Sequence, residues 1–187
     1  MMRDLLAFAL EKGIHPDIAR QWIREKKIPP PERPPPGWPM PVRIRAADGL
    51  VVELDETSGG DAATDETQGA PGKGGKSAQK LRELLAVLVA RPRGATQAEL
   101  ADWLWPNADG DKAAASLKVA VHRLRQWLGA EAVRVQDGRT SLDPRVVGCD
   151  VWGPPAALED PERVLHGFDL PPIVAMRRKL RAGMRPA

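Results

Sequence analysis

The chain of 187 residues has no tyrosine, only two phenylalanines and a single cysteine, Cys149. With so few other aromatic residues, the leucines and the six tryptophans must build most of any hydrophobic core. A lone cysteine excludes a disulfide within the chain, which fits a reducing cytoplasm. The apolar runs are far too short to cross a bilayer, and acidic residues interrupt the brief apolar stretch that follows Met1. The sequence therefore predicts a cytoplasmic protein with no membrane segment and no signal peptide.

Residues that support metal binding or catalysis are also scarce. His15, His122 and His166 are scattered along the chain, and none has a second ligand at the spacing of a metal site. No nucleophile–base pair and no pair of acids stands out either. The sequence therefore predicts no metal site, no cofactor and no enzymatic activity.

One stretch supports a rival interpretation as an enzyme. Residues 70–77 read APGKGGKS, a relaxed P-loop pattern with Ala70 where the first glycine should stand. In a P-loop the backbone amides hold phosphates and the lysine reaches the outer ones, but a buried strand comes first. The polar residues before Ala70 are not such a strand. Nucleotide binding is therefore the least favoured alternative, and a linker whose Lys76 and Lys80 contact DNA phosphates is the simpler interpretation.

Charge is distributed unevenly along the chain. Residues 46–72 contain seven acids and no lysine or arginine, whereas residues 73–145 contain thirteen lysines and arginines against eight acids. The acidic stretch can bury little apolar surface, so we expect it to be a disordered linker. The basic stretch carries the surplus of positive charge that phosphate binding requires.

The most informative stretch is residues 94–143, which reads as a short helix, a loop, a longer basic helix and a two-stranded hairpin. In the longer helix, four apolar residues fall on one stripe, the spacing of a buried face, and these are Leu117, Val121, Leu124 and Leu128. Asp109 or Asp111 can cap its start. Gly129 follows its last leucine, where a glycine commonly ends a helix.

The opposite face of this helix combines hydrogen-bond donors with small apolar groups. It carries Lys112, Ala115, Val119, His122, Arg123 and Gln126, and its flanks carry Ser116, Lys118 and Arg125. Arg123 can donate a bidentate pair to guanine, and the methyl groups of Ala115 or Val119 can meet that of thymine. Lys112, His122 and Arg125 suit phosphates better. The alternative is an ordinary amphipathic helix with a solvated basic face.

Two shorter helices precede the basic helix. Thr96 and Glu99 have the spacing of a capping box, and Pro106 ends the helix that follows them. Leucines at helical spacing predict an earlier helix from Ser77, as N-cap, to Ala90. We expect Trp103 and Trp105 to pack against the core.

Two β-hairpins are predicted. In residues 133–136, Arg134 belongs to the polar side of an alternating strand, and Asp137-Gly138 is a strong turn signal before the return strand Arg139–Leu142. Arg139 lies near the tip, where it could reach a phosphate or serve only as a solubilising charge. Residues 42–45 and 50–54 predict a second hairpin around Asp48-Gly49.

Together these motifs resemble the OmpR/PhoB-type winged helix, in particular the bacterial transcriptional activators that include the Streptomyces antibiotic regulatory proteins. The resemblance is carried by LWP in residues 104–106, RLRQWLG in residues 123–129 and DVW in residues 150–152. The segments before and after it are similar to those of large MalT-like regulators. The resemblance implies a winged helix-turn-helix that binds double-stranded DNA and recruits RNA polymerase.

The family's pattern also implies roles for particular residues. Its base contacts come from outward positions of the third helix, which correspond here to Ser116, Val119, His122, Arg123 and Arg125. In some relatives the loop before this helix contacts polymerase, which makes Trp105, Asn107 and Asp109 candidates. A single domain of this size would bind one half-site weakly, so we expect a homodimer or tandem binding on DNA.

The sequence thus predicts a mainly α protein with small β elements, built as a winged helix-turn-helix with an N-terminal helical hairpin and a disordered acidic linker. The expected divisions are a helical hairpin at 1–28, a proline-rich linker at 29–41, a winged-helix domain at 42–153 with a flexible insertion at 55–75, and a basic helical tail at 154–187. The helical hairpin could be mistaken for a second DNA-binding unit, but packing or dimerisation is favoured. The main functional alternative is a winged helix that binds protein and not DNA.

Overall fold

A computed structural model describes residues 42–54, 75–152 and 158–183. The helical hairpin expected at 1–28, the proline-rich linker at 29–41 and all but the last residue of the insertion at 55–75 lie outside these ranges. The described residues are about 52% helical and 20% strand. The expected helices and small β elements are present, although this strand content makes the described chain a mixed α/β protein and not a mainly α one.

The described residues form four α-helices, two small sheets and two single-turn helices. In chain order these elements are β1 (Val42–Arg45), β2 (Val51–Leu54), α3 (Lys76–Ala90), β3 (Ala95–Thr96), α4 (Gln97–Leu104), α5 (Gly110–Leu128), η1 (Ala130–Ala132), β4 (Val133–Gln136), β5 (Arg139–Leu142), β6 (Val147–Cys149), η2 (Asp150–Trp152) and α6 (Pro171–Gly183).

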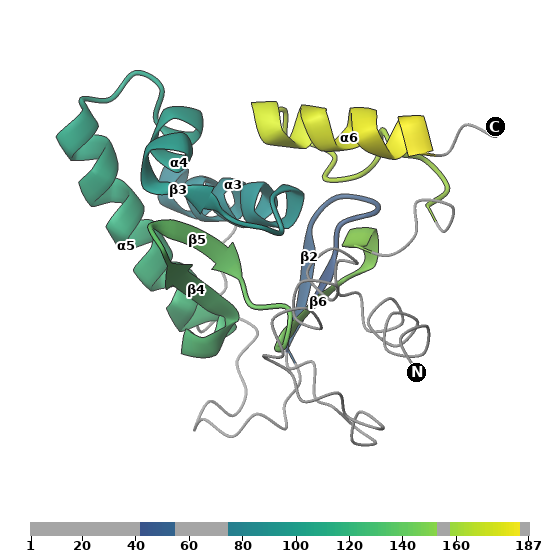
Figure 1. Cartoon of the computed structure of the whole chain (residues 1–187), viewed down its shortest axis with the longest axis horizontal. Coiled ribbons are helices and arrows are strands. Elements are labelled where there is room, and N and C mark those ends of the chain that lie inside the picture. The colour runs from purple at the N-terminus through teal and green to yellow at the C-terminus, as the bar shows by residue number, and fades with distance from the viewer. Residues whose placement is uncertain (1–41, 55–74, 153–157, 184–187) are drawn as a thin grey trace.

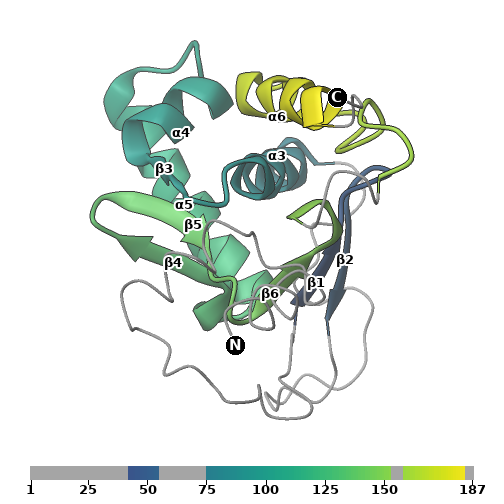
Figure 2. The same ribbon diagram turned by 45° about the vertical axis from the view of Figure 1, so that its right-hand side comes forward.

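Helix α3 lies at the centre of the molecule (Figures 1 and 2). The hairpin β4–β5 and α5 lie on one side of it, the sheet of β1, β2 and β6 lies on the other, and α6 runs above it. Every residue of α3 from Leu84 to Val89 is buried, although a surface helix would expose one side of each turn. The other elements therefore pack around this helix.

The first sheet has the strand order β2–β1–β6. In β1, buried Val42 and Ile44 alternate with exposed arginines, as in a strand with one face on the core. The predicted hairpin of β1 and β2 is confirmed, with Val42 opposite Leu54. Strand β6 was not predicted, because a run of three residues carries no alternation signal. It pairs parallel to β1, so the end of the 75–152 range lies beside the first strand of the 42–54 range.

The second sheet has the strand order β3–β5–β4. The predicted turn is confirmed, since Asp137 and Gly138 both have positive φ, 52° and 71°, as a type I′ turn requires. The two-residue strand β3 was missed. Gly94, the residue before β3, lies so close to β5 that a Cβ on it would be 2.7 Å from the carbonyl oxygen of Thr140. Gly94 also has a φ of 79°. Only glycine fits this position without a backbone shift.

Helices α4 and α5 follow the sequence signals closely. The capping box of α4 is confirmed: the Glu99 amide donates to Thr96 Oγ1 at 3.2 Å, and the Thr96 amide donates to Glu99 Oε2 at 2.8 Å. Asp109 is the N-cap residue of α5, but its side chain accepts no capping hydrogen bond, and Gly129 ends the helix as predicted. The N-cap prediction for α3 was wrong, because the helix begins at Lys76 and Ser77 lies within its first turn.

The C-terminal segment expected as a separate tail shares the core of the preceding residues. Val164, Leu165, Ile173 and Leu180 belong to the same buried cluster as α3. The Leu165 amide donates to the Ala46 carbonyl at 2.7 Å. Residues 158–183 therefore pack as part of the same folded unit.

We predict that Thr96→Ala lowers the free energy of unfolding by about 1 kcal/mol, because it removes the hydroxyl that accepts from the Glu99 amide. Urea denaturation followed by circular dichroism measures the change. Thr96→Ser is the matched control, since it keeps the hydroxyl and should stay near the wild-type value. An equal loss in both variants would contradict a capping role.

Candidate functional site

The exposed face of α5 is the first part of the candidate site. All but one of the positions expected on this face or its flanks are exposed, and the exposed ones are Lys112, Ala115, Ser116, Lys118, Val119, His122, Arg123 and Gln126. Arg125 is partly buried. The opposite stripe of Leu117, Val121, Leu124 and Leu128 is buried as predicted. The helical spacing therefore placed both faces correctly.

A groove of about 530 Å³ runs between α5 and the start of α3. It is lined by Lys76, Ser77, Lys80, Leu81, Trp105, Ala115, Ser116, Val119, Ala120 and Arg123. Most of these residues were singled out from the sequence, although they come from separate helices and a loop. Folding thus gathers the two lysines of α3 and part of the α5 face around one depression.

The charges along this groove differ in how far they are neutralised. Lys80 pairs with Glu83 of its own helix, with 2.7 Å between Lys80 Nζ and Glu83 Oε2. The Arg123 guanidinium donates to Ser77 Oγ across the groove. Within the described ranges, Lys76 has no ion-pair partner. Val119 is 54% exposed beside these groups.

Two predicted DNA-contacting arginines make contacts inside the molecule. Arg125 Nε donates to the carbonyl of Val133 at 3.1 Å, which ties α5 to β4. Arg134 donates to Gln136 Oε1 at 2.7 Å, and its Nε lies 3.6 Å from the buried carboxylate of Asp143. Arg125 therefore helps to hold the hairpin against α5, whereas the contacts of Arg134 lie within the hairpin and at its end.

Arg139 lies beside the turn of the hairpin, as expected, but its side chain is hydrogen-bonded within the molecule. It is the first residue of β5, and its guanidinium donates to the carbonyl of Gly94 at 3.1 Å. It also lies 3.7 Å from Glu99 Oε2, while Arg91 lies 3.2 Å from the other oxygen of Glu99. The Arg91 guanidinium stacks over Trp103 at 5.4 Å from the ring centroid. Arg139 thus joins a network that centres on one carboxylate.

The loop between α4 and α5 exposes Asn107 and Asp109. The Asp109 carbonyl accepts from the Ala113 amide at 2.8 Å and so starts the α5 ladder, while its carboxylate stays at the surface. Trp105 is partly buried and packs against the core, as expected, and it also lines the groove. The loop therefore offers an amide and a carboxylate to any partner that approaches α5 from this end.

Metal and thiol chemistry find no support in residues 42–54, 75–152 and 158–183. No three His, Cys, Asp or Glu side chains gather there in a group that could hold a metal ion. Burial raises the pKa of the Cys149 thiol well above its ordinary value, and the neighbouring Asp150 carboxylate raises it further.

Among the helices in residues 42–54, 75–152 and 158–183, none has an apolar stretch long enough to cross a membrane.

Three groove residues, Ser77, Leu81 and Ala120, were not predicted as site residues. Ser77 was interpreted as an N-cap, yet its hydroxyl contacts Arg123, 46 positions later in the chain. Leu81 is one of the leucines whose spacing predicted the helix, and it also lines the groove. No signal in the sequence pairs Ser77 with Arg123, because the two positions meet only when α3 and α5 pack together.

No protein-family model matches this chain, and no curated protein matches it.

We predict that the stabilising effect of Glu99 depends on pH. The hydrogen bond donated by the Thr96 amide, together with the positive charges of Arg91 and Arg139, lowers the pKa of Glu99 below its ordinary value of 4.5. A lowered pKa in the folded state means that the ionised carboxylate stabilises the fold fully above pH 4.5, and that this contribution is lost as the pH falls through the lower value. Glu99→Gln should therefore be less stable than wild type at neutral pH, and the difference should shrink below pH 4.5.

Urea denaturation across this pH range tests the prediction. Asp102→Asn, on the same helix and exposed, is the matched control and should stay close to wild type at neutral pH. A Glu99→Gln deficit that does not change with pH would show that the charge of Glu99 contributes nothing.

Proposed function

We propose that this chain is a sequence-specific DNA-binding transcription regulator with a winged helix-turn-helix fold. In this proposal α4 and α5 are the helix-turn-helix, α5 lies in the major groove of duplex DNA, and the hairpin β4–β5 is the wing. The element order α3–β3–α4–α5–β4–β5 supports the fold assignment. No catalytic step is part of the proposal.

One observation carries the proposal: the exposed face of α5 combines cations with small apolar groups, and the lysines of α3 adjoin it in the same groove. A phosphate-binding face alone needs only cations, since phosphates carry charge and no sequence information. Reading of base edges needs forked donors for guanine and apolar contacts for the methyl group of thymine. The α5 face offers both.

The roles of the α5 side chains follow from their chemistry. Arg123 can donate two hydrogen bonds to one guanine, and its contact with Ser77 restricts where its guanidinium lies. Val119 and Ala115 are exposed on the same side and can meet thymine methyl groups. Lys112, Lys118 and His122 are exposed and suit the phosphates that border the groove.

The hairpin contributes less charge to DNA than its sequence suggests. Arg134 faces Asp143, and Arg139 shares Glu99 with Arg91. Their positive charges are therefore partly neutralised within the molecule, and we assign them mainly to holding the hairpin. Asn107 and Asp109 are the contacts we propose for RNA polymerase, because they are exposed beside α5 and carry no core-packing role.

The second candidate function is a winged helix that binds a protein. The exposure of Val119 on α5 and of Val135 on β4, each 54%, favours it, because the fully buried core of a protein interface is more apolar than the rest of the surface. The same two valines are compatible with DNA contact, since thymine presents a methyl group. Measurement of DNA binding decides between the two.

The experiment is selection of a randomised duplex library on the purified full chain, with sequencing of the bound DNA and affinity measured over a range of salt concentrations. A specific regulator enriches a short motif, as a single half-site or a repeat, and binds more weakly as salt rises. Failure to enrich any motif at low salt would reject base reading and leave the protein-binding alternative.

We predict that Arg123→Ala reduces discrimination between the selected motif and random duplex by about 1–3 kcal/mol. Lys118→Ala is the matched control, because it removes an exposed cation from the same helix and should weaken both duplexes alike. Fluorescence anisotropy with labelled duplexes measures all four affinities. Equal losses on both duplexes for Arg123→Ala would contradict a base-reading role.

A further inference from the structure

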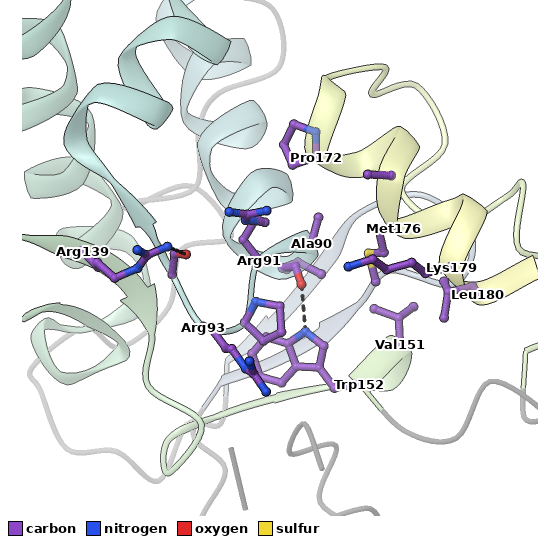
Figure 3. A pocket seen from close by; sticks show the side chains of 14 residues that line it. Ala90, Arg91, Arg93, Arg139, Val151, Trp152, Pro172, Met176, Lys179 and Leu180 are labelled. Carbon is purple, nitrogen blue, oxygen red and sulfur yellow. Dashed lines mark hydrogen bonds between the residues drawn. The ribbon is translucent and has the colours of Figure 1, made fainter. Parts of the chain in front are cut away.

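A second groove of about 510 Å³ lies between α6, the turn after α3 and the start of β5 (Figure 3). Its lining comes from Val89, Ala90, Arg91, Pro92, Arg93, Gly94, Arg139, Val151, Trp152, Pro172, Ala175, Met176, Lys179 and Leu180. None of these residues belongs to α5, so this α6 groove is a different site from the proposed DNA-binding face.

The charged side chains that line the α6 groove are all cations. Arg91, Arg93 and Arg139 come from one end of it and Lys179 of α6 from the other, as Figure 3 shows. Glu99 pairs with Arg91 and with Arg139 and is not part of the lining. Within the described ranges, Lys179 has no ion-pair partner. The groove therefore keeps a net positive charge.

Between these cations the lining is apolar. Met176, Leu180 and Val151 lie around the Lys179 end, and Pro92 also lines the groove. The floor is Trp152, whose indole N–H donates to the Val89 carbonyl at 2.9 Å. This hydrogen bond leaves no unpaired donor in the floor. The groove thus presents an apolar surface between two positively charged ends.

The combination of cations and apolar lining in the α6 groove suits an acidic peptide better than a DNA backbone. A DNA backbone is a continuous row of phosphates with sugars between them, so an apolar floor adds little to its binding. A peptide with carboxylates on either side of an apolar side chain matches both the charges and the floor. Its carboxylates would meet Lys179 at one end and the arginines at the other, with charge-assisted hydrogen bonds that fix its direction.

We propose that the α6 groove binds an acidic amphipathic segment of a partner protein. An apolar side chain of the segment packs over Met176 and Trp152, and its carboxylates pair with Lys179 and with Arg91, Arg93 or Arg139. An incoming carboxylate that pairs with Arg91 or Arg139 shares that arginine with Glu99, so the network around Glu99 becomes part of the interface. The proposal does not depend on DNA binding by α5.

The test is selection of short random peptides, displayed on phage, against the full-length chain, followed by fluorescence anisotropy with the enriched peptides. We expect enrichment of sequences that carry Asp or Glu on both sides of an apolar residue. Lys179→Glu should weaken their binding about tenfold, because it replaces an attraction by a repulsion at one end. Arg178→Glu is the matched control, with the same charge change on the same helix at a position outside the groove lining.

The contribution of the apolar floor is tested separately. Met176→Ser keeps every charge and should also weaken binding, whereas a purely electrostatic surface would not respond. Thermal unfolding of each variant shows whether α6 still packs. Enrichment of no acidic sequence, or equal weakening by Lys179→Glu and Arg178→Glu, would overturn the proposal.

Duplex DNA serves as the last control. Lys179→Glu should bind the duplexes selected on the wild-type chain with unchanged affinity, because the α6 groove does not adjoin α5. If Lys179→Glu weakens duplex and peptide binding to the same extent, the groove is a backbone-contact surface and the peptide proposal fails. A chain that binds no duplex but still binds acidic peptides would reject the proposed function and retain this one.

Discussion

The burial of α3 is the constraint on which the rest of the structure depends. Its run from Leu84 to Val89 is buried on all sides, so apolar surface must cover it from several directions. Helix α5 and the hairpin β4–β5 cover one side, the β2–β1–β6 sheet another, and α6 a third (Figures 1 and 2). The backbone N–H and C=O groups of this run form hydrogen bonds within the helix, so their burial does not leave them without partners. The C-terminal segment is consequently part of the core.

Both grooves arise where elements that pack on α3 leave a gap at one of its ends. At the N-terminal end, α5 passes beside Lys76 and Lys80, and the depression between the helices collects their charges with Val119 and Arg123. At the C-terminal end, the turn at residues 91–94, helix α6 and Trp152 line the α6 groove. Each end of one buried helix thus carries a basic surface, and the two surfaces differ in their apolar content and in the partners that suit them.

Arginines that were all candidates for DNA contact in the sequence have different roles in the fold. Arg123 reaches across a groove to Ser77, Arg125 fastens α5 to β4, and Arg139 turns toward Gly94 and Glu99. The difference follows from their positions relative to the core and not from their chemistry. A guanidinium beside a backbone carbonyl or a carboxylate is bonded within the molecule before any partner arrives. Counting the basic residues of residues 94–143 therefore overstates the charge that is free to meet DNA.

The sequence by itself determined the local elements: the capping box of Thr96 and Glu99, the turn at Asp137-Gly138, the end of α5 at Gly129 and the two faces of that helix. Each depends on residues within a few positions of one another, where helical or strand periodicity and turn chemistry act directly. Tertiary structure decided the pairing of β6 with β1, the short strand β3, the contact of Ser77 with Arg123 and the packing of α6 over Trp152. These join residues far apart in the chain, and a strand of two or three residues has no periodicity to reveal it. They form only because α3 requires cover on every side, which no local pattern records.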